Sequence, residues 1–197
     1  PIDSWTKNMN DIQKEAAEHE IDLDKVGVKG VRYPIVVLDK KDEHQHTVAT
    51  INMYVNLPRH FRGTHMSRFI EILNHHSRRM MLHNIDPILT EMKDKLDAES
   101  AHLEIAFPYF IEKTAPVSGQ KSTMVYDCKF IASQRDHTEL VVEVNVPVMS
   151  LCPCSKEISD RGAHNQRGIV TVRLKAEKFI WIEDIVKLVE GAASSDV

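Results

Sequence analysis

Apolar residues alternate with polar ones along several stretches of the chain, which is the pattern of strands with one buried face. The clearest stretch is HTVATINMYVNL, and these apolar residues fall on one of its sides: Ala49, Ile51, Met53, Val55 and Leu57. The run VRYPIVVL at 31–38 precedes it, and the polar turn DKKDEHQ between them predicts a long antiparallel hairpin. Pro34 indicates that the first strand lies at a sheet edge, because proline has no N–H for a neighbouring strand.

The apolar period then changes to that of a helix. The spacing i, i+3, i+4, i+7 is followed by Met66, Phe69, Ile70 and Leu73, and Thr64 or a neighbour is a candidate cap. A second helix is predicted to open at Asp86-Pro87, with the stripe Ile88, Leu89, Met92 and Leu96. We interpret both stripes as core packing.

Strand patterns return in HLEIAFPYFIEK and STMVYDCKFIAS and, after a turn at 134–138, in LVVEVNVPV and GIVTVRLKA. The residues predicted to share a side in the last two runs are Val142, Val144, Val146 and Val148, and then Val170, Val172 and Leu174. Cys128, midway along a strand, is predicted to be core. A final helix is predicted in IWIEDIVKLVEGA, with the stripe Ile182, Ile185, Val186 and Val189.

The order of elements predicts an α+β fold. Two strands, two helices and two strands form a first unit, and two strands and a helix begin to repeat it before the sequence stops. Because each strand has one apolar side, helices should cover one face of the antiparallel sheet. We expect an arm at 1–28, a first module at 29–135 and a second, incomplete module at 136–197.

Composition narrows the class of protein. With 42% apolar and 27% charged residues, the chain has the composition of a soluble globular protein. No apolar run approaches the roughly 20 residues that cross a bilayer, and the first stretch lacks the features of a signal peptide. The net charge of −4 argues against nonspecific nucleic-acid binding. We therefore expect a cytoplasmic protein without a membrane or nucleic-acid partner.

The segment SLCPCSKEISDRGAHNQRG at 150–168 lies between two predicted strands, where scaffolds commonly carry functional loops. Cysteine sulfur and imidazole nitrogen are natural ligands for zinc and similar metals, so Cys152, Cys154 and His164 are candidates. Their spacing fits no zinc-finger pattern. The alternative is that both thiols are small buried groups at a strand end and that His164 caps a turn. The residues alone leave these two interpretations open.

Several long runs resemble the type IB family of GTP cyclohydrolase I. They are SLCPCSKEISDRGAHNQRG, LPRHFRGTHMSRFIEILN, FPYFIEKTAPVSG, HTVATINMYVNLP and FIWIEDIVKLVE. The resemblance implies the tunnelling fold, built from ββααββ modules, and homotetramers with active sites where subunits meet. It also implies a hydrolase of cyclic amidine C–N bonds that converts GTP to 7,8-dihydroneopterin triphosphate and formate, the entry step to folate-type pterins.

The resemblance also implies a set of metal ligands. In this sequence they are the first cysteine of CPC, Cys152, and the histidine of GAHNQR, His164; the third, a glutamate, is expected beyond Val197. Such a set accepts zinc, manganese or iron. A metal held there would lower the pKa of its bound water toward about 7 and so activate the water for hydrolysis. Cys154 would either tune the metal from outside its coordination sphere or be a packed thiol.

Cations are needed for the triphosphate of GTP. Lys156 and Arg167, in the cysteine loop, are the first candidates, followed by Arg62, His65 and Arg68 of FRGTHMSR. Arginine suits planar bidentate phosphate contacts, whereas lysine acts as a point charge. Surface solvation is the alternative for each of these groups, most seriously for Arg68.

Two rival functions fit the same sequence. In one, Cys152 attacks a substrate carbon covalently, as in the tunnelling-fold nitrile reductase, and no metal is required. In the other, the chain is a non-catalytic, metal-responsive or scaffold protein that keeps the fold. Activity that survives exhaustive chelation would favour the first, and metal binding without formate release would favour the second.

Overall fold

The computed structural model describes residues 22–59, 63–76, 84–115, 118–151, 153–159, 165–175 and 179–193, without the side chains at 155, 156 and 165. Within these residues, six strands form one antiparallel sheet in which each strand pairs with the next along the chain. The strands are β1 (Leu23–Asp39), β2 (Glu43–Leu57), β3 (Ala101–Thr114), β4 (Lys121–Gln134), β5 (Thr138–Leu151) and β6 (Asn165–Lys175).

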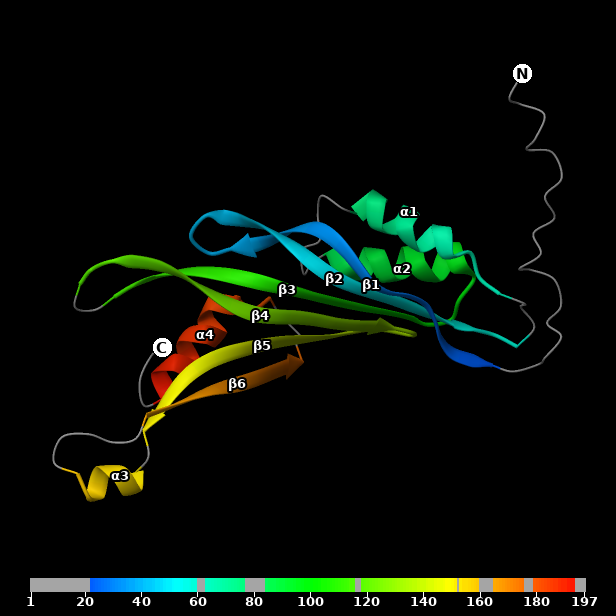
Figure 1. Ribbon diagram of the computed structural model, residues 1–197. Coiled ribbons are helices and arrows are strands. Elements are labelled where there is room, and N and C mark those ends of the chain that lie inside the picture. The colour runs from blue at the N-terminus through cyan, green and yellow to red at the C-terminus, as the bar shows by residue number, and fades with distance from the viewer. Residues whose placement is uncertain are drawn as a thin grey trace.

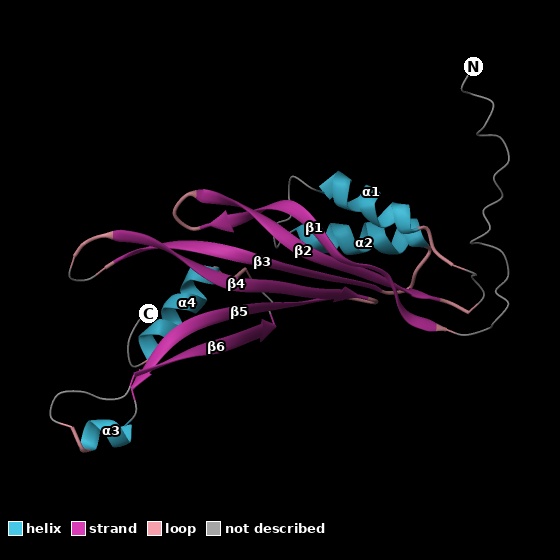
Figure 2. Ribbon diagram, in the orientation of Figure 1, coloured by secondary structure: helices cyan, strands magenta, loops and turns pink. Residues whose placement is uncertain are grey.

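In the described part of the chain, four helices accompany the sheet: α1 (Met66–His76), α2 (Ile85–Leu96), α3 (Pro153–Glu157) and α4 (Ile182–Ala192). Helices α1 and α2 lie side by side over the β1–β3 part of the sheet, and α4 packs against β5 (Figure 1). Helix α3 stands apart, in the connection between β5 and β6 (Figure 2). None of the described helices is both long enough and apolar enough to cross a bilayer.

One hydrophobic core joins the sheet to α1, α2 and α4. Alternate residues of β2 to β5 are buried, and the register places them on the same face, as in the pairs Ile105–Phe130 and Phe130–Val142. Cys128 is part of this core, with 2% of its surface exposed. The predicted α+β class and the predicted coverage of one sheet face by helices are therefore confirmed.

Strand β1 is longer than the pattern predicted. It begins at Leu23 rather than Val31, so residues 23–28 of the predicted arm belong to the sheet, while 1–21 lie outside the described residues. The early part has little apolar alternation of its own, and pairing with β2 defines it, with register shifts before Val26 and before Val31. Pro34 lies on an edge strand as predicted, because β1 has a single neighbour.

The predicted face of α1 was partly wrong. Its buried residues are Phe69, Ile72 and Leu73, whereas Met66 is 41% and Ile70 is 39% exposed. The helix packs on both α2 and β1, and this contact selects a face rotated from the simple i, i+3, i+4 stripe. The stripe of α2 was correct.

The start of α2 also differs from the prediction. Asn84 is the capping residue by position, without a side-chain cap, and Asp86 lies inside the first turn. The Asp86 carboxylate accepts a hydrogen bond from Gln134 Nε2 at 2.9 Å. It therefore fastens α2 to the end of β4 instead of capping its own helix.

Helix α4 is fastened to the β1–β2 turn and to β3 by hydrogen bonds to one carboxylate oxygen. The hydroxyl of Tyr109, on β3, donates to Glu183 Oε1 at 2.7 Å, and the backbone N–H of Lys40 donates to the same oxygen at 2.7 Å. Burial and the neighbouring Glu183 carboxylate raise the pKa of Tyr109, so the hydroxyl stays protonated and donates at any ordinary pH. This contact fixes the first turn of α4 against the sheet.

Gly27 is a position where the sheet has no room for a side chain. A Cβ there would lie 1.9 Å from the Met53 carbonyl oxygen, which is backbone of the paired strand β2. We expect Gly27→Ala to lower the free energy of unfolding by about 3 kcal/mol, because β1 must move away from β2. Denaturant unfolding at a fixed protein concentration measures the change.

Gly191→Ala is the matched control, since Gly191 lies in α4 with open space where a Cβ would be. It should stabilise the protein by roughly 0.5–1 kcal/mol through its helix propensity. Equal stability of Gly27→Ala and the wild type would show that β1 yields at no cost and would refute the prediction.

Candidate active site

The connection between β5 and β6 carries the predicted cysteine and histidine. The last pair of the β5–β6 ladder is Leu151 with Asn165. Cys152 follows Leu151 in the sequence and His164 precedes Asn165, and both lie outside the described residues. The described frame of the candidate site is therefore the end of this hairpin and the helix α3.

Helix α3 begins at Pro153, which suits a first helical position because its missing N–H needs no partner there. Cys154 lies in this helix as an exposed free thiol. Among the described residues no side chain buries this thiol, which does not favour the packed-thiol interpretation of Cys154. Ile158, just after α3, is 89% exposed, so the connection presents an apolar side chain to its surroundings.

The two first candidates for triphosphate contacts lie at this hairpin. Lys156 belongs to α3, although its side chain is outside the described part of the structure. Arg167 lies on β6, opposite Met149, two positions beyond the Leu151–Asn165 pair, and it is exposed. Among the described strands β6 has one neighbour, β5, so β6 forms an edge of the described sheet at Arg167.

The other candidates lie elsewhere in the chain. We call the end of the sheet with the β1–β2, β3–β4 and β5–β6 connections the α3 end. Helix α1 starts after β2 has run to the opposite end (Figure 1). There Arg68 donates from Nη1 to the Lys95 carbonyl oxygen at 2.6 Å, close to the start of β3, and half-buried His65 lies three residues earlier. Arg62 is outside the described residues.

The length of the sheet separates these two groups of candidates. Strand β5 has 14 residues between the opposite end and the α3 end, which corresponds to about 45 Å at ~3.4 Å per residue. Within a single chain, the structure therefore brings Lys156 and Arg167 to the hairpin but leaves His65 and Arg68 far from it.

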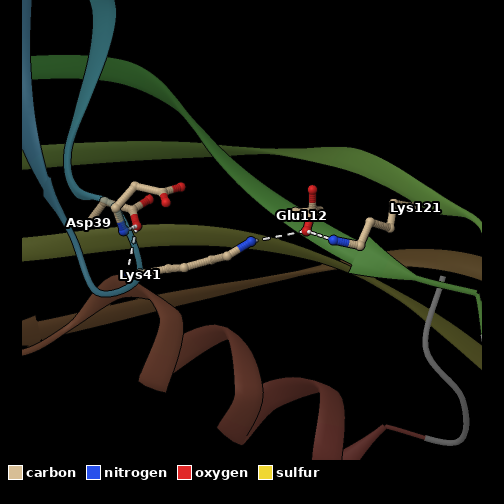
Figure 3. Close-up of polar contacts among 5 residues, drawn as sticks. Asp39, Lys41, Glu112 and Lys121 are labelled. Atoms are coloured by element: carbon tan, nitrogen blue, oxygen red, sulfur yellow. Dashed lines mark hydrogen bonds and ion pairs between the residues drawn. The ribbon is translucent and has the colours of Figure 1, made fainter.

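Charged side chains that the sequence did not single out gather at the α3 end. Figure 3 shows Glu112 between Lys41 and Lys121, with both ammonium groups 3.0 Å from its Oε1. Hydrogen bonds from Lys41 and Lys121 hold the pKa of Glu112 below its ordinary value. The two lysine side chains are 67% and 65% exposed, so this end offers cations beyond those of the cysteine loop.

Lys113 is a cation of the same end whose charge is already matched. Its ammonium group pairs with Glu190 of α4, and the Tyr126 hydroxyl donates to the other oxygen of that carboxylate at 2.9 Å. The Glu190 side chain is largely covered, with 11% of its surface exposed. Lys113 therefore fastens β3 to α4 and is less available to an incoming phosphate than Lys41 or Lys121.

Among the described residues, one group of side chains has the geometry to hold a metal ion. It consists of His75, His76 and Glu91, whose ligand atoms lie within 4.8 Å of one another. It belongs to α1 and α2 and not to the β5–β6 connection. The sequence offered only a weak signal for it, two adjacent histidines on a polar helix face.

Comparisons with known proteins add to this geometry. A family described as type I GTP cyclohydrolase FolE2 matches residues 9–197. The GTP cyclohydrolase FolE2 of Geotalea uraniireducens (strain Rf4) is 57% identical over 189 residues, which cover 96% of this chain and 70% of that protein. The protein of the same name from Geobacter sulfurreducens is 57% identical over 189 residues, covering 96% of this chain and 73% of its own length.

A third relative, the GTP cyclohydrolase FolE2 of Syntrophus aciditrophicus (strain SB), is 56% identical over 190 residues, covering 96% of this chain and 74% of that protein. The matched region includes both the β5–β6 connection and the 57–74 segment on which the resemblance was founded. The chain therefore belongs to the type I GTP cyclohydrolase FolE2 family.

Proposed function

We infer that the chain is a GTP cyclohydrolase of folate-type pterin biosynthesis. The observation that carries this conclusion is the family match over residues 9–197, with relatives above half identity that bear that name. The products follow from the family's chemistry: 7,8-dihydroneopterin triphosphate and formate. A cytoplasmic location belongs to the same proposal.

The residues at the end of the β5–β6 hairpin fit a metal centre. We propose Cys152 and His164 as two ligands and a glutamate beyond Val197 as the third. The pairing of Leu151 with Asn165 supports this choice. Cys152 and His164 are adjacent in the sequence to these two paired residues, so we propose that both can bind one ion. Thiolate, imidazole and carboxylate together suit zinc, manganese or iron. Such an ion supplies Lewis acidity and a water of lowered pKa beside the purine.

The chain's own cations would hold the triphosphate. Lys156 and Arg167 are the proposed contacts from the hairpin, and exposed Arg167 has no described acceptor that would compete with a phosphate. Arg167 can bind two phosphate oxygens at once, while Lys156 adds a point charge. Positioned cations also stabilise the charge of the bound nucleotide, because a closed site screens them less than bulk water does.

The remaining candidates fit if the site is shared between chains. His65 and Arg68 lie at the opposite end of the sheet, and Arg62 precedes them closely in the sequence, so we expect this segment to reach a cysteine loop only in a second copy. Exposed apolar side chains support such an assembly at the β6 edge and the α3 connection, with Ile169 71% and Ile158 89% exposed. We propose a homotetramer with its active sites between subunits.

The fold proposal follows the same family. The six-stranded meander with helices on one face is what a ββααββ module and the first strands of a second would form. We therefore propose the tunnelling fold, with a first module at 29–135 and a second that begins at 136 and whose remaining elements would follow Val197.

GTP turnover and its metal dependence test the proposed activity. The purified full-length protein, loaded with Zn²⁺, Mn²⁺ or Fe²⁺, should release formate from GTP and form a fluorescent pterin after oxidation. Exhaustive chelation should abolish both signals, and returning the metal should restore them. Activity that survives chelation would favour a covalent role of the Cys152 thiol, and metal binding without formate release would favour a non-catalytic protein.

A further inference from the structure

Two histidines at the end of α1 converge on one carboxylate of α2. His75 Nδ1 lies 2.9 Å and His76 Nε2 lies 2.6 Å from the same oxygen, Oε2 of Glu91. The two imidazole rings are adjacent, with centroids 4.8 Å apart and planes tilted by 52°. Neighbouring helix residues point in directions about 100° apart, so both rings reach one oxygen only because α2 presents Glu91 between them.

The separations suit a metal ion. All three ligand atoms lie within 4.8 Å of one another. Donors around a tetrahedral zinc ion lie ~3.3 Å apart, since zinc–nitrogen and zinc–oxygen bonds measure about 2.0–2.2 Å. Shifts of the ligand atoms by a few tenths of an ångström to about an ångström would therefore give the separations that a zinc ion requires. Two imidazoles and a carboxylate are also the ligand set that zinc takes in many proteins.

Burial and charge fit the same interpretation. The side chains of His76 and Glu91 are each 17% exposed, while that of His75 is 69% exposed, so among the described residues the cluster is accessible from the His75 side. Burial opposes ionisation of Glu91, but hydrogen bonds from Lys95, His75 and His76 outweigh it and hold its pKa at about 2. The carboxylate is therefore charged at neutral pH.

Lys95 occupies the other oxygen of this carboxylate. Its Nζ lies 2.7 Å from Glu91 Oε1, and its side chain is 41% exposed. A metal on Oε2 can coexist with this pair, although the ammonium group would lower the affinity for a second cation. Replacing Lys95 should therefore raise the affinity of the site for a metal ion without changing any of the three ligands.

The geometry points to a divalent transition-metal site, zinc by its ligand type, formed by His75, His76 and Glu91. Within one chain it lies apart from the proposed catalytic centre, because α1 packs on β1 at one edge of the sheet while the cysteine loop joins β5 to β6 at the other. In an assembly the two sites still differ in their ligands, since this cluster contains no thiolate. A bound ion would join the last residues of α1 to the middle of α2. The full-length protein then takes up two metal equivalents per chain, one with a thiolate ligand and one without.

Titration with Co²⁺ and Zn²⁺ separates the two sites in the full-length protein. Cobalt at the proposed catalytic centre gives a thiolate-to-cobalt charge-transfer band, whereas cobalt at the helix site gives only weak visible bands of nitrogen and oxygen ligation. We expect Cys152→Ala to lose the charge-transfer band and keep one equivalent of cobalt. Adding His75→Ala and His76→Ala to that variant should weaken the remaining binding at least about 100-fold.

Three further variants sharpen the test. Glu91→Gln keeps the shape of α2 and should also weaken binding in the Cys152→Ala background, should the double histidine variant fail to fold. Lys95→Met should tighten Zn²⁺ binding roughly three- to tenfold, since it removes a nearby positive charge. His137→Ala is the matched control, because His137 lies on the surface 3.6 Å from Glu139 and belongs to no metal-binding group among the described residues, so it should change nothing.

Zinc should also raise the melting temperature of Cys152→Ala but not of the variant that lacks both histidines. The proposal is overturned if Cys152→Ala binds no stoichiometric cobalt or zinc. It is equally overturned if the histidine or Glu91 substitutions leave the affinity unchanged, or if Lys95→Met fails to increase it. None of these outcomes depends on GTP turnover, so they are independent of the proposed activity.

Discussion

Cys152→Ala is expected to reduce GTP turnover by on the order of a thousandfold or more. The substitution removes a thiolate from the proposed catalytic ligand set, and the two remaining ligands bind an ion far more weakly. We expect the fold to be unaffected, because the core described for the sheet, α1, α2 and α4 is built from residues of those elements. Formate release measures turnover, circular dichroism measures the fold, and the thiolate-to-cobalt charge-transfer band measures thiolate ligation of the metal.

Cys154→Ala is the matched comparison, since it removes a thiol two residues away that the structure leaves exposed and free. It should reduce turnover only mildly and leave the charge-transfer band in place. An intact band in Cys152→Ala would remove this residue from the ligand set. Equal losses in both variants would mean that the two thiols have been assigned in the wrong order.

Mixing two inactive variants should restore activity if each active site is built from two chains. One variant is Cys152→Ala, and the other carries Arg62→Ala and His65→Ala together. In a mixed oligomer, some sites take an intact cysteine loop from the Arg62→Ala/His65→Ala chain and an intact FRGTHMSR segment from the Cys152→Ala chain. Random assembly in equal amounts makes about a quarter of the sites intact, so about a quarter of the wild-type activity should return after subunit exchange.

The arrangement of the sheet is the reason for this expectation. Arg68 is hydrogen-bonded to the Lys95 carbonyl oxygen at the end of the sheet opposite α3. One chain therefore cannot bring the FRGTHMSR segment to its own cysteine loop, because the length of β5 separates them. If the segments acted within a single chain, every site of the mixture would keep one defect. Activity would then stay at the level of the two separate variants. Size-exclusion chromatography with light scattering must show that mixed oligomers have formed.

Much of the fold was predictable because burial follows the period of the sequence. The alternation in β2 and β5 predicted their buried faces, and the stripes of α2 and α4 were correct as well. These segments succeed because each has one apolar face with the expected period, and that face packs on the core. The edge position of β1 followed from Pro34 for a similarly local reason, its missing N–H.

The failures occur where contacts with distant residues decide the structure. The first part of β1 carries little apolar alternation, and its pairing with β2 makes it a strand. The buried face of α1 depends on α2 and β1 together, which turns Ile72 inward and leaves Ile70 partly exposed. Gly27 gives no local sign that the Met53 carbonyl oxygen fills the space where its side chain would be.

For the site, the sequence by itself determined the family and the residue types of the predicted metal centre, because long motifs such as SLCPCSKEISDRGAHNQRG keep their order and spacing. Only the tertiary structure decided which groups meet. It paired Leu151 with Asn165, separated the cysteine loop from Arg68 by the length of β5, and brought His75 and His76 to Glu91. Residue order fixes neighbours along a chain, whereas distances between remote side chains depend on how strands pair and helices pack.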